Sequence, residues 1–144
     1  MTTTPFRLRK HAEYQRVYKA SRKQFGKQMS YFFTARTEEE IQRDVDGATG
    51  ARIGLTVGKV MGKAVDRNRI KRRMREVIRK NLVALRTPVD VILHPRRSVI
   101  DLEFGLLDRE VAQVFRAIQK MADRQPVARV ENSGTRDEGL GTRD

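Results

Sequence analysis

The sequence predicts one small α/β domain, a two-layer sandwich in which helices pack on a sheet. Its 144 residues are enough for a single domain with a core of its own. Apolar residues recur in the order helix–strand–strand–helix–strand–helix, and one further strand is allowed before the central helix. We place the folded domain at residues 5–125. Residues 126–144 lack an apolar period and predict a disordered tail.

The first predicted element is a short helix at residues 10–20. It lies in a basic region, residues 5–27, that holds eight Lys or Arg against one acid. Tyr14, Val17 and Tyr18 share one side of this helix. The pattern favours core packing for the two tyrosines. Aromatic rings beside a basic surface can also stack on unpaired bases, so both interpretations remain open here.

Three strands are predicted, at residues 29–36, 52–57 and 89–94. Alternation in the first strand places Tyr31 and Phe33 on one face and Phe32 on the other. The third strand is apolar nearly throughout, so we expect it to be largely buried. Between the first two strands, residues 37–51 are acidic and lack an apolar period, and we interpret them as a mobile hairpin loop.

The central helix is predicted to begin at Asp66, a good N-cap residue, and to end before Pro88. Residues 63–80 hold nine Lys or Arg against two acids. Yet apolar residues such as Ile70 and Met74 recur through the run at helical spacing, which a disordered basic tail would not keep. The run is therefore a folded helix with one face in the core and a densely cationic face outside.

The last predicted helix covers residues 101–124 and has an amphipathic stripe that includes Leu107, Val111 and Phe115. The second strand, the central helix and the third strand form a strand–helix–strand unit. Such units cross over right-handed by default, so a right-handed crossover is the first expectation.

On a helical wheel of about 100° per residue, a polar stripe lies opposite the apolar side of the central helix. Its members are Asn68, Arg72, Arg75 and Arg79, with Lys71 at its border. Arg67 and Arg69 lie at the helix N-terminus, where the positive dipole makes cations costly but helps to bind anions. The planar fork of arginine bonds two phosphate oxygens at once and stacks on bases. The stripe is therefore suited to a polyanion.

Asn68 has two interpretations that the sequence weighs evenly. It can bond a base edge, a sugar hydroxyl or a metal-bound water. It can equally be a first-turn residue that satisfies a free backbone N–H.

Composition points to nucleic acid as the partner. The net charge is +13 and the pI is about 10.9, the electrostatic signature of a nucleic-acid binder rather than of a surface kept basic for solubility. There is no cysteine, which excludes disulfides and fits a reducing cytoplasm. No signal-peptide pattern is present, no apolar run approaches the ~18 residues of a membrane span, and no membrane role is expected.

No catalytic or metal-binding set emerges from the sequence. His11 and His94 are the only histidines, and neither lies near a carboxylate cluster at ligand spacing. A nuclease acting alone would need fixed metal ligands or an acid–base pair. We therefore assign no catalytic and no metal-binding residue to the chain.

The run Arg67-Asn68-Arg69, with Ile70-Lys71-Arg72 and Arg75-Glu76 after it, resembles the signature of the bacterial ribonuclease P protein component. Residues 52–59 and 62–65 resemble the family's strand and lead-in before that helix, and residues 6–18 resemble its first helix. The resemblance covers about residues 5–124. Its central motif is specific, and the flanks support it.

The resemblance implies a fold with a left-handed crossover, in place of the default hand. It also implies a cytoplasmic subunit of an endoribonuclease that binds a catalytic RNA and precursor tRNA. The holoenzyme removes the 5′ leader by hydrolysis of one phosphodiester. The RNA holds the catalytic Mg²⁺, while the protein helps to bind precursor and raises metal affinity. No protein partner is implied.

The resemblance also assigns residues to two RNA partners. The catalytic RNA is expected at Lys59, Lys63, Arg67, Asn68, Arg69, Lys71, Arg72, Arg75 and Arg79. The single-stranded leader is expected in a cleft with Tyr14, Tyr18 and Phe32. Both tyrosines stand where phenylalanine is common in the family, and Val60 stands where many relatives carry a second lysine. The alternatives are a basic ribosomal protein or RNA chaperone without a link to cleavage and, less favoured, a free-standing nuclease.

Overall fold

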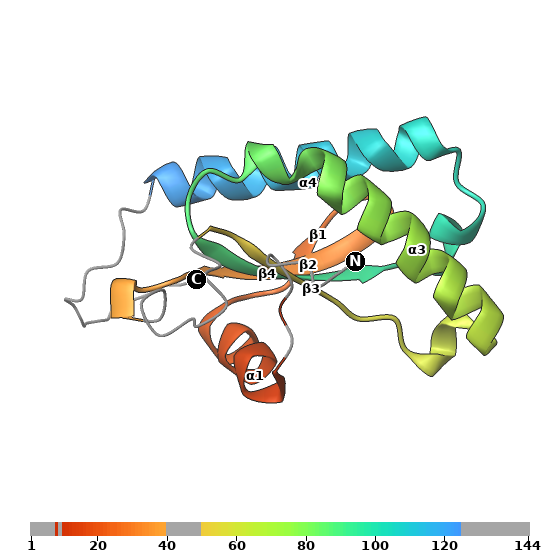
Figure 1. The fold of residues 1–144 in the computed structure, drawn as a ribbon, viewed down its shortest axis with the longest axis horizontal. Helices are drawn as coiled ribbons and strands as arrows, with labels where there is room; N and C mark the ends of the chain where they lie inside the picture. Colours follow the sequence, from red (N-terminus) through yellow and green to blue (C-terminus); the bar gives the residue numbers. More distant parts are fainter. Residues whose placement is uncertain (1–7, 9, 40–49, 125–144) are drawn as a thin grey trace.

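A computed structural model describes residues 8, 10–39 and 50–124 of the chain as one mixed α/β unit (Figure 1). Its helices and strands are α1 (His11–Ala20), β1 (Gln24–Phe25), β2 (Met29–Ala35), β3 (Arg52–Leu55), α3 (Ala64–Asn81), β4 (Val89–Pro95) and α4 (Phe104–Arg124). Helices α3 and α4 cover one face of the sheet and α1 covers the other. The predicted α/β domain is confirmed. The predicted tail and most of the acidic segment lie outside the described residues.

The four strands of the described residues lie in the order β1-β2-β4-β3. Strand β4 pairs antiparallel with β2 and parallel with β3, so β3, α3 and β4 form the predicted strand–helix–strand unit. Because β4 lies between β2 and β3, the acidic segment that joins those two strands does not close a hairpin, and that prediction was wrong. Strand β4 is the most apolar of the strands, and the central position buries it on both faces.

A fourth strand, β1, is a two-residue edge strand paired antiparallel with β2, and it lies before the first predicted strand instead of directly before the central helix. Strand β2 ends at Ala35, one residue before the predicted end. Strand β3 ends at Leu55, two residues before its predicted end.

Helix α3 begins earlier and ends earlier than predicted. Its N-cap is Lys63, so Asp66 lies in the first turn, where its carboxylate still faces the positive end of the helix dipole. The helix ends at Asn81, well before Pro88. The Asn81 amide Nδ2 donates to the Val77 carbonyl at 2.8 Å, and side-chain bonding of this kind competes with continued helix.

Helix α4 begins at Phe104 and not at Asp101, because Arg97–Ile100 form a separate 3-10 turn. Glu103 precedes the helix, and its Oε1 accepts the Leu106 N–H at 3.1 Å. The same N–H also donates to the Glu103 carbonyl at 3.0 Å, so Glu103 receives the first-turn N–H with both its backbone and its side chain.

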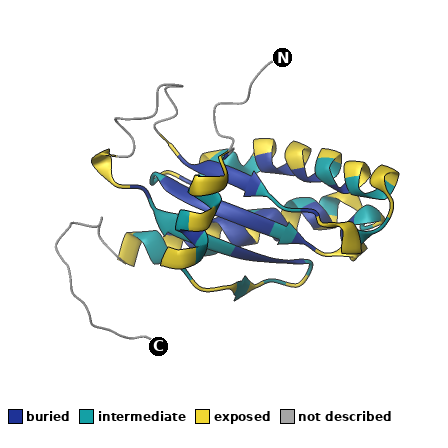
Figure 2. Cartoon of the chain, turned by 90° about the horizontal axis from the view of Figure 1, so that it is seen from below, coloured by how far each residue is buried: buried dark blue, intermediate teal, exposed yellow. Residues whose placement is uncertain are grey.

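The main core lies between the sheet and helices α3 and α4, and it includes Tyr31, Met74 and Phe115. A second, smaller cluster lies on the α1 side of the sheet. Strand β2 supplies both, because its alternation sends Tyr31 to the main core and Phe32 to the α1 side, as predicted. Figure 2 shows the buried strands flanked by helices whose outer faces are exposed.

Candidate nucleic-acid interface

The outer side of α3 carries the predicted polar stripe. On the inner side, Ile70, Met74, Val77 and Ile78 are buried against the core. All members of the stripe, Asn68, Arg72, Arg75 and Arg79, are exposed. Arg79 Nη1 lies 2.8 Å from Glu76 Oε1. This carboxylate partly offsets the positive charge of the stripe. The stripe is exposed at each of its four positions, as a polyanion-binding face requires.

Asn68 cannot cap the helix. The first backbone bond of α3 runs from the Arg67 N–H to the Lys63 carbonyl at 2.9 Å, so Asn68 lies past the free N–H groups. The interpretation of Asn68 as a first-turn residue that satisfies a free N–H depended on a helix start at Asp66. Because α3 begins at Ala64, that interpretation is wrong. The exposed Asn68 amide remains available for an external partner.

The lead-in to α3 is held in a conformation that suits glycine. Gly62 has φ 124°, in the region that L side chains rarely adopt. A β-carbon at this position would also lie 2.7 Å from Arg97 Nη1. That Arg97 nitrogen donates to the Met61 carbonyl at 2.9 Å. This turn places the exposed Lys59 and Lys63 at the N-terminal end of α3, beside the stripe.

Two arginines of α3 contact the chain before α4. Arg69 Nε donates to the Ile100 carbonyl at 3.0 Å, and Arg73 donates to the Ile100 and Leu102 carbonyls. Arg69, assigned above to RNA binding, therefore also ties α3 to this segment. Arg73 lies outside the predicted stripe, and its structural role was not visible in the sequence.

On the opposite face of the sheet, the structure brings together the three aromatic residues assigned to the leader. Tyr14, Tyr18 and Phe32, here called the aromatic cluster, are half-buried and pack on Leu8, Val17 and Ile92. The Tyr18 and Phe32 rings meet edge to face, with centroids 4.9 Å apart. Each ring thus packs on the small core and also keeps exposed surface, so neither interpretation of these residues excludes the other.

Tyr14 lies directly over Gly54 of β3. A β-carbon at Gly54 would lie 2.6 Å from the Tyr14 hydroxyl oxygen and 2.7 Å from its Cζ. The hydroxyl donates to the Leu8 carbonyl at 3.4 Å. Glycine at this strand position therefore makes room for the ring.

His94 joins the aromatic cluster, which sequence reasoning missed. Its Nε2 lies 2.9 Å from the Tyr18 hydroxyl, and its ring centroid is 5.5 Å from that of Phe32. Burial, and then the positive charge of Lys23, lower the pKa of His94 below its ordinary value. The sequence does not show that His94 lies beside these rings. Its position follows from the pairing of β2 with β4, in which His94 lies opposite Ser30.

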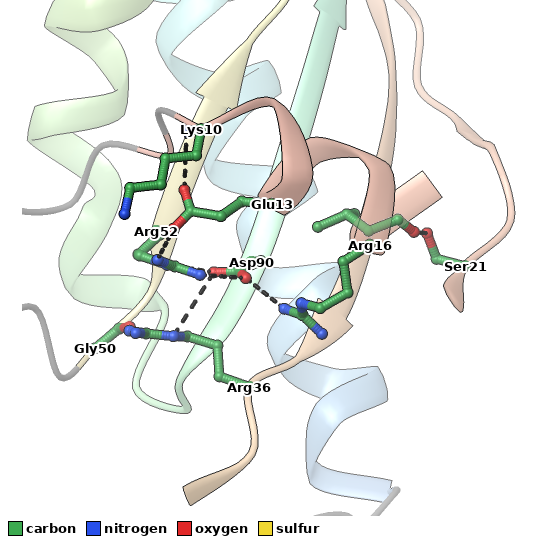
Figure 3. Close-up of polar contacts among 9 residues, drawn as sticks. Lys10, Glu13, Arg16, Ser21, Arg36, Gly50, Arg52 and Asp90 are labelled. Atoms are coloured by element: carbon green, nitrogen blue, oxygen red, sulfur yellow. Dashed lines mark hydrogen bonds and ion pairs between the residues drawn. The ribbon is translucent and has the colours of Figure 1, made fainter. Parts of the chain in front are cut away.

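A buried ionic network lies under α1 (Figure 3). Asp90 of β4 is fully buried, and its carboxylate accepts two bonds from Arg52 at 2.8 Å and one from Arg16 at 2.5 Å. Glu13 of α1 accepts a further bond from Arg52 at 2.7 Å. Although burial acts to lower the pKa of Arg52, these two carboxylates raise it above its ordinary value. Arg36 is also buried, and its Nε lies 3.7 Å from Asp90 Oδ1. The network joins α1 to the sheet.

The part of the chain that the structure describes offers no cluster of three His, Cys, Asp or Glu side chains that could hold a metal ion. Within the same residues, no helix is both long and apolar enough to cross a membrane.

A cationic helix on one face of the sheet and half-buried aromatics on the other define a small basic protein of the nucleic-acid-binding class. The family model described as Ribonuclease P matches residues 3–119. The ribonuclease P protein component of Finegoldia magna is 32% identical over 110 residues, covering 76% of this chain and 88% of the relative. That of Fusobacterium nucleatum is 30% identical over 113 residues, covering 76% and 93%. The chain belongs to the ribonuclease P protein family.

Solved structures of the family share the fold. The Staphylococcus aureus RNase P protein superposes with a TM-score of 0.63 at 25% identity, covering 79% of this chain and 95% of the other. The RNase P protein from Thermotoga maritima has a TM-score of 0.63 at 21% identity, covering 77% and 96%, and this likeness concerns the fold alone.

Proposed function

We propose that the chain is the protein subunit of a ribonuclease P, an endoribonuclease whose catalytic centre lies in its RNA subunit. One observation carries the proposal: an exposed guanidinium stripe and a half-buried aromatic cluster lie on opposite faces of one sheet. The exposed guanidinium stripe of α3 suits the phosphates of a structured RNA. The half-buried aromatic cluster beneath α1 suits unpaired bases. A protein that binds a catalytic RNA and a single-stranded leader needs both.

In this proposal the catalytic RNA lies along α3 and its lead-in turn. The contacting residues are Lys59, Lys63, Arg67, Asn68, Arg69, Lys71, Arg72, Arg75 and Arg79. Seven of these positions belong to one helix, so they can follow a phosphate backbone without reordering. Asn68, whose side chain is exposed beside these cations, is assigned to the RNA in this proposal.

The 5′ leader of precursor tRNA lies on the aromatic cluster. Tyr14, Tyr18 and Phe32 each offer ring surface to a base, and stacking on such surface tolerates any sequence. Tolerance is what a general tRNA-processing factor needs, because leaders differ between precursors. Mature tRNA lacks the leader, so this surface distinguishes precursor from product.

The chemistry is hydrolysis of one phosphodiester at the mature 5′ end, in the cytoplasm. We assign the catalytic Mg²⁺ to the RNA subunit. What the chain contributes is positive charge between two polyanions. Its cations offset repulsion between catalytic RNA and precursor, which favours the bound state.

Reconstitution tests the proposal. The full chain, added to a bacterial catalytic RNA and precursor tRNA at low Mg²⁺, should accelerate release of the 5′ leader. Structured RNA binding without acceleration would instead favour the ribosomal-protein or RNA-chaperone function. Cleavage by the chain with no RNA subunit present would favour a free-standing nuclease.

A second test addresses the leader surface. Phe32→Ala removes one stacking ring and should weaken precursor binding by about 1–3 kcal/mol while leaving mature tRNA binding unchanged. Equal losses of binding for precursor and mature tRNA would contradict the placement of the leader on this surface.

A further inference from the structure

An exposed aromatic residue lies on the edge strand β1. Phe25 is 70% exposed, and the Lys23 ammonium lies 5.7 Å from its ring centroid. A single exposed hydrophobic residue needs no explanation by itself. Its place on the sheet makes Phe25 different from the other exposed apolar residues.

The strand register places Phe25 on the face that carries the aromatic cluster. Phe25 lies opposite Ser30 of β2, and Ser30 lies opposite His94 of β4. Residues directly opposite in neighbouring strands share a face, so all three point to the α1 side with Phe32. Strands lie about 4.8 Å apart, which puts Phe25 about 10 Å from His94 across the sheet.

Lys23 interacts with both Phe25 and His94, the two ends of the row formed by Phe25, Ser30 and His94. Its ammonium lies near the Phe25 ring, and its charge is also close enough to His94 to affect the protonation of that imidazole. His94 in turn contacts Tyr18 and Phe32. Ring and cation surface therefore continues from the aromatic cluster to the sheet edge.

We propose that Phe25, Lys23 and His94 extend the leader-binding surface, so that Phe25 stacks on a leader base beyond those held by the aromatic cluster. This inference rests on the proposed function. Lys23 supplies a cation for the phosphate of the same nucleotide, and the Tyr18–His94 pair offers a polar edge between the two stacking positions. An aromatic ring beside a cation is the usual composition of a single-stranded RNA site.

The Tyr18 hydroxyl is the group that meets His94. The hydroxyl and the imidazole thus form a hydrogen-bonding group that a phenylalanine at position 18 could not provide.

The test measures precursor binding by the complex of the full chain with catalytic RNA. Precursors differ only in leader length, increased one nucleotide at a time. For the unmodified chain, affinity should rise over the first nucleotides and rise again when the leader reaches Phe25. Phe25→Ala should remove the second rise only, a loss of about fivefold to about tenfold with long leaders.

Two further variants complete the test. Phe25→Trp should keep the second rise, because it keeps the stacking surface. Val83→Ala, a matched change at a residue that is 84% exposed away from this row, should match the unmodified chain.

The outcomes separate the two proposals. If the unmodified chain prefers precursor to mature tRNA but Phe25→Ala binds long leaders equally well, the extension is wrong and the proposed function stands. An equal loss for short and long leaders would also overturn the extension. If the unmodified chain shows no preference for precursor, both proposals fail.

Discussion

Replacing Asp90 with alanine should destabilise the fold more than the loss of an exposed ion pair. Asp90 is fully buried, and Arg52, only 9% exposed, donates two bonds to its carboxylate. Without Asp90, the Arg52 guanidinium stays in a poorly solvated site, where Glu13 Oε2 still lies 2.7 Å from its Nη1. Removing one partner of a buried pair costs about 3–5 kcal/mol. Because Glu13 remains, we expect about 3 kcal/mol.

That loss is large beside the ~5–15 kcal/mol by which domains are stable. Urea unfolding of the full chain, followed by far-ultraviolet circular dichroism, measures it. The matched control is Glu76→Ala, which removes the carboxylate from an ion pair whose side chains are 61% and 52% exposed. Such pairs contribute about 0–1 kcal/mol, so the control should lie close to the unmodified protein.

Coupling gives a sharper form of the same test. The double variant Asp90→Ala with Arg52→Ala removes charge and counter-charge together. Its loss of stability should be smaller than the sum of the two single losses. If the free energy of unfolding of Asp90→Ala lies within about 1 kcal/mol of that of the unmodified protein, the reasoning is refuted. Such a result would mean that the buried arginines of the network do not need this carboxylate.

Three other predictions test the two surfaces. Arg72→Ala with Arg75→Ala should weaken RNA binding and lower its salt-dependence slope by about two, one for each lost phosphate contact; an unchanged slope would contradict the assigned face. Gly54→Ala should displace the tyrosine ring above it, costing about 1–3 kcal/mol of stability and weakening leader binding. Gly58→Ala, where an added β-carbon meets nothing within 4 Å, is its control. The pKa of His94 is lower in the folded protein than its ordinary value of about 6.5, so the neutral imidazole stabilises the fold. This contribution to stability is complete above about pH 6.5, and it is lost as the pH falls through the lowered pKa. Between about pH 7 and about pH 5 the unmodified protein should therefore lose more stability than His94→Gln, and equal losses would contradict this sign.

Local patterns predicted the cationic helix well. The apolar period that includes Ile70 and Met74 orients α3, and the polar stripe opposite it follows from the same geometry. The ends of α3 were predicted less well. Asn81 ends the helix through its amide, and Lys63 precedes it without a capping bond. Neither signal is as strong in a sequence as the proline and aspartate on which the prediction relied.

The aromatic cluster was predicted only in part. Alternation along β2 separated Phe32 from Tyr31, and helical spacing put Tyr14 and Tyr18 on one side of α1. His94 and Phe25 were missed because their position depends on which residues of β1 and β4 face β2. A shift of one residue in either register would send these side chains to the other face.

The sequence by itself determined the charge of this protein, the two sides of its central helix and the family signature within it. These features depend on residues a few positions apart, whose relation the 3.6-residue and two-residue periods dictate. Only the tertiary structure decided that β4 lies between β2 and β3, that Asp90 binds arginines from α1 and β3, and that Phe25 shares a face of the sheet with the aromatic cluster. Those contacts join residues far apart in the chain, and long-range pairing is selected by burial of the whole sheet rather than by any local pattern.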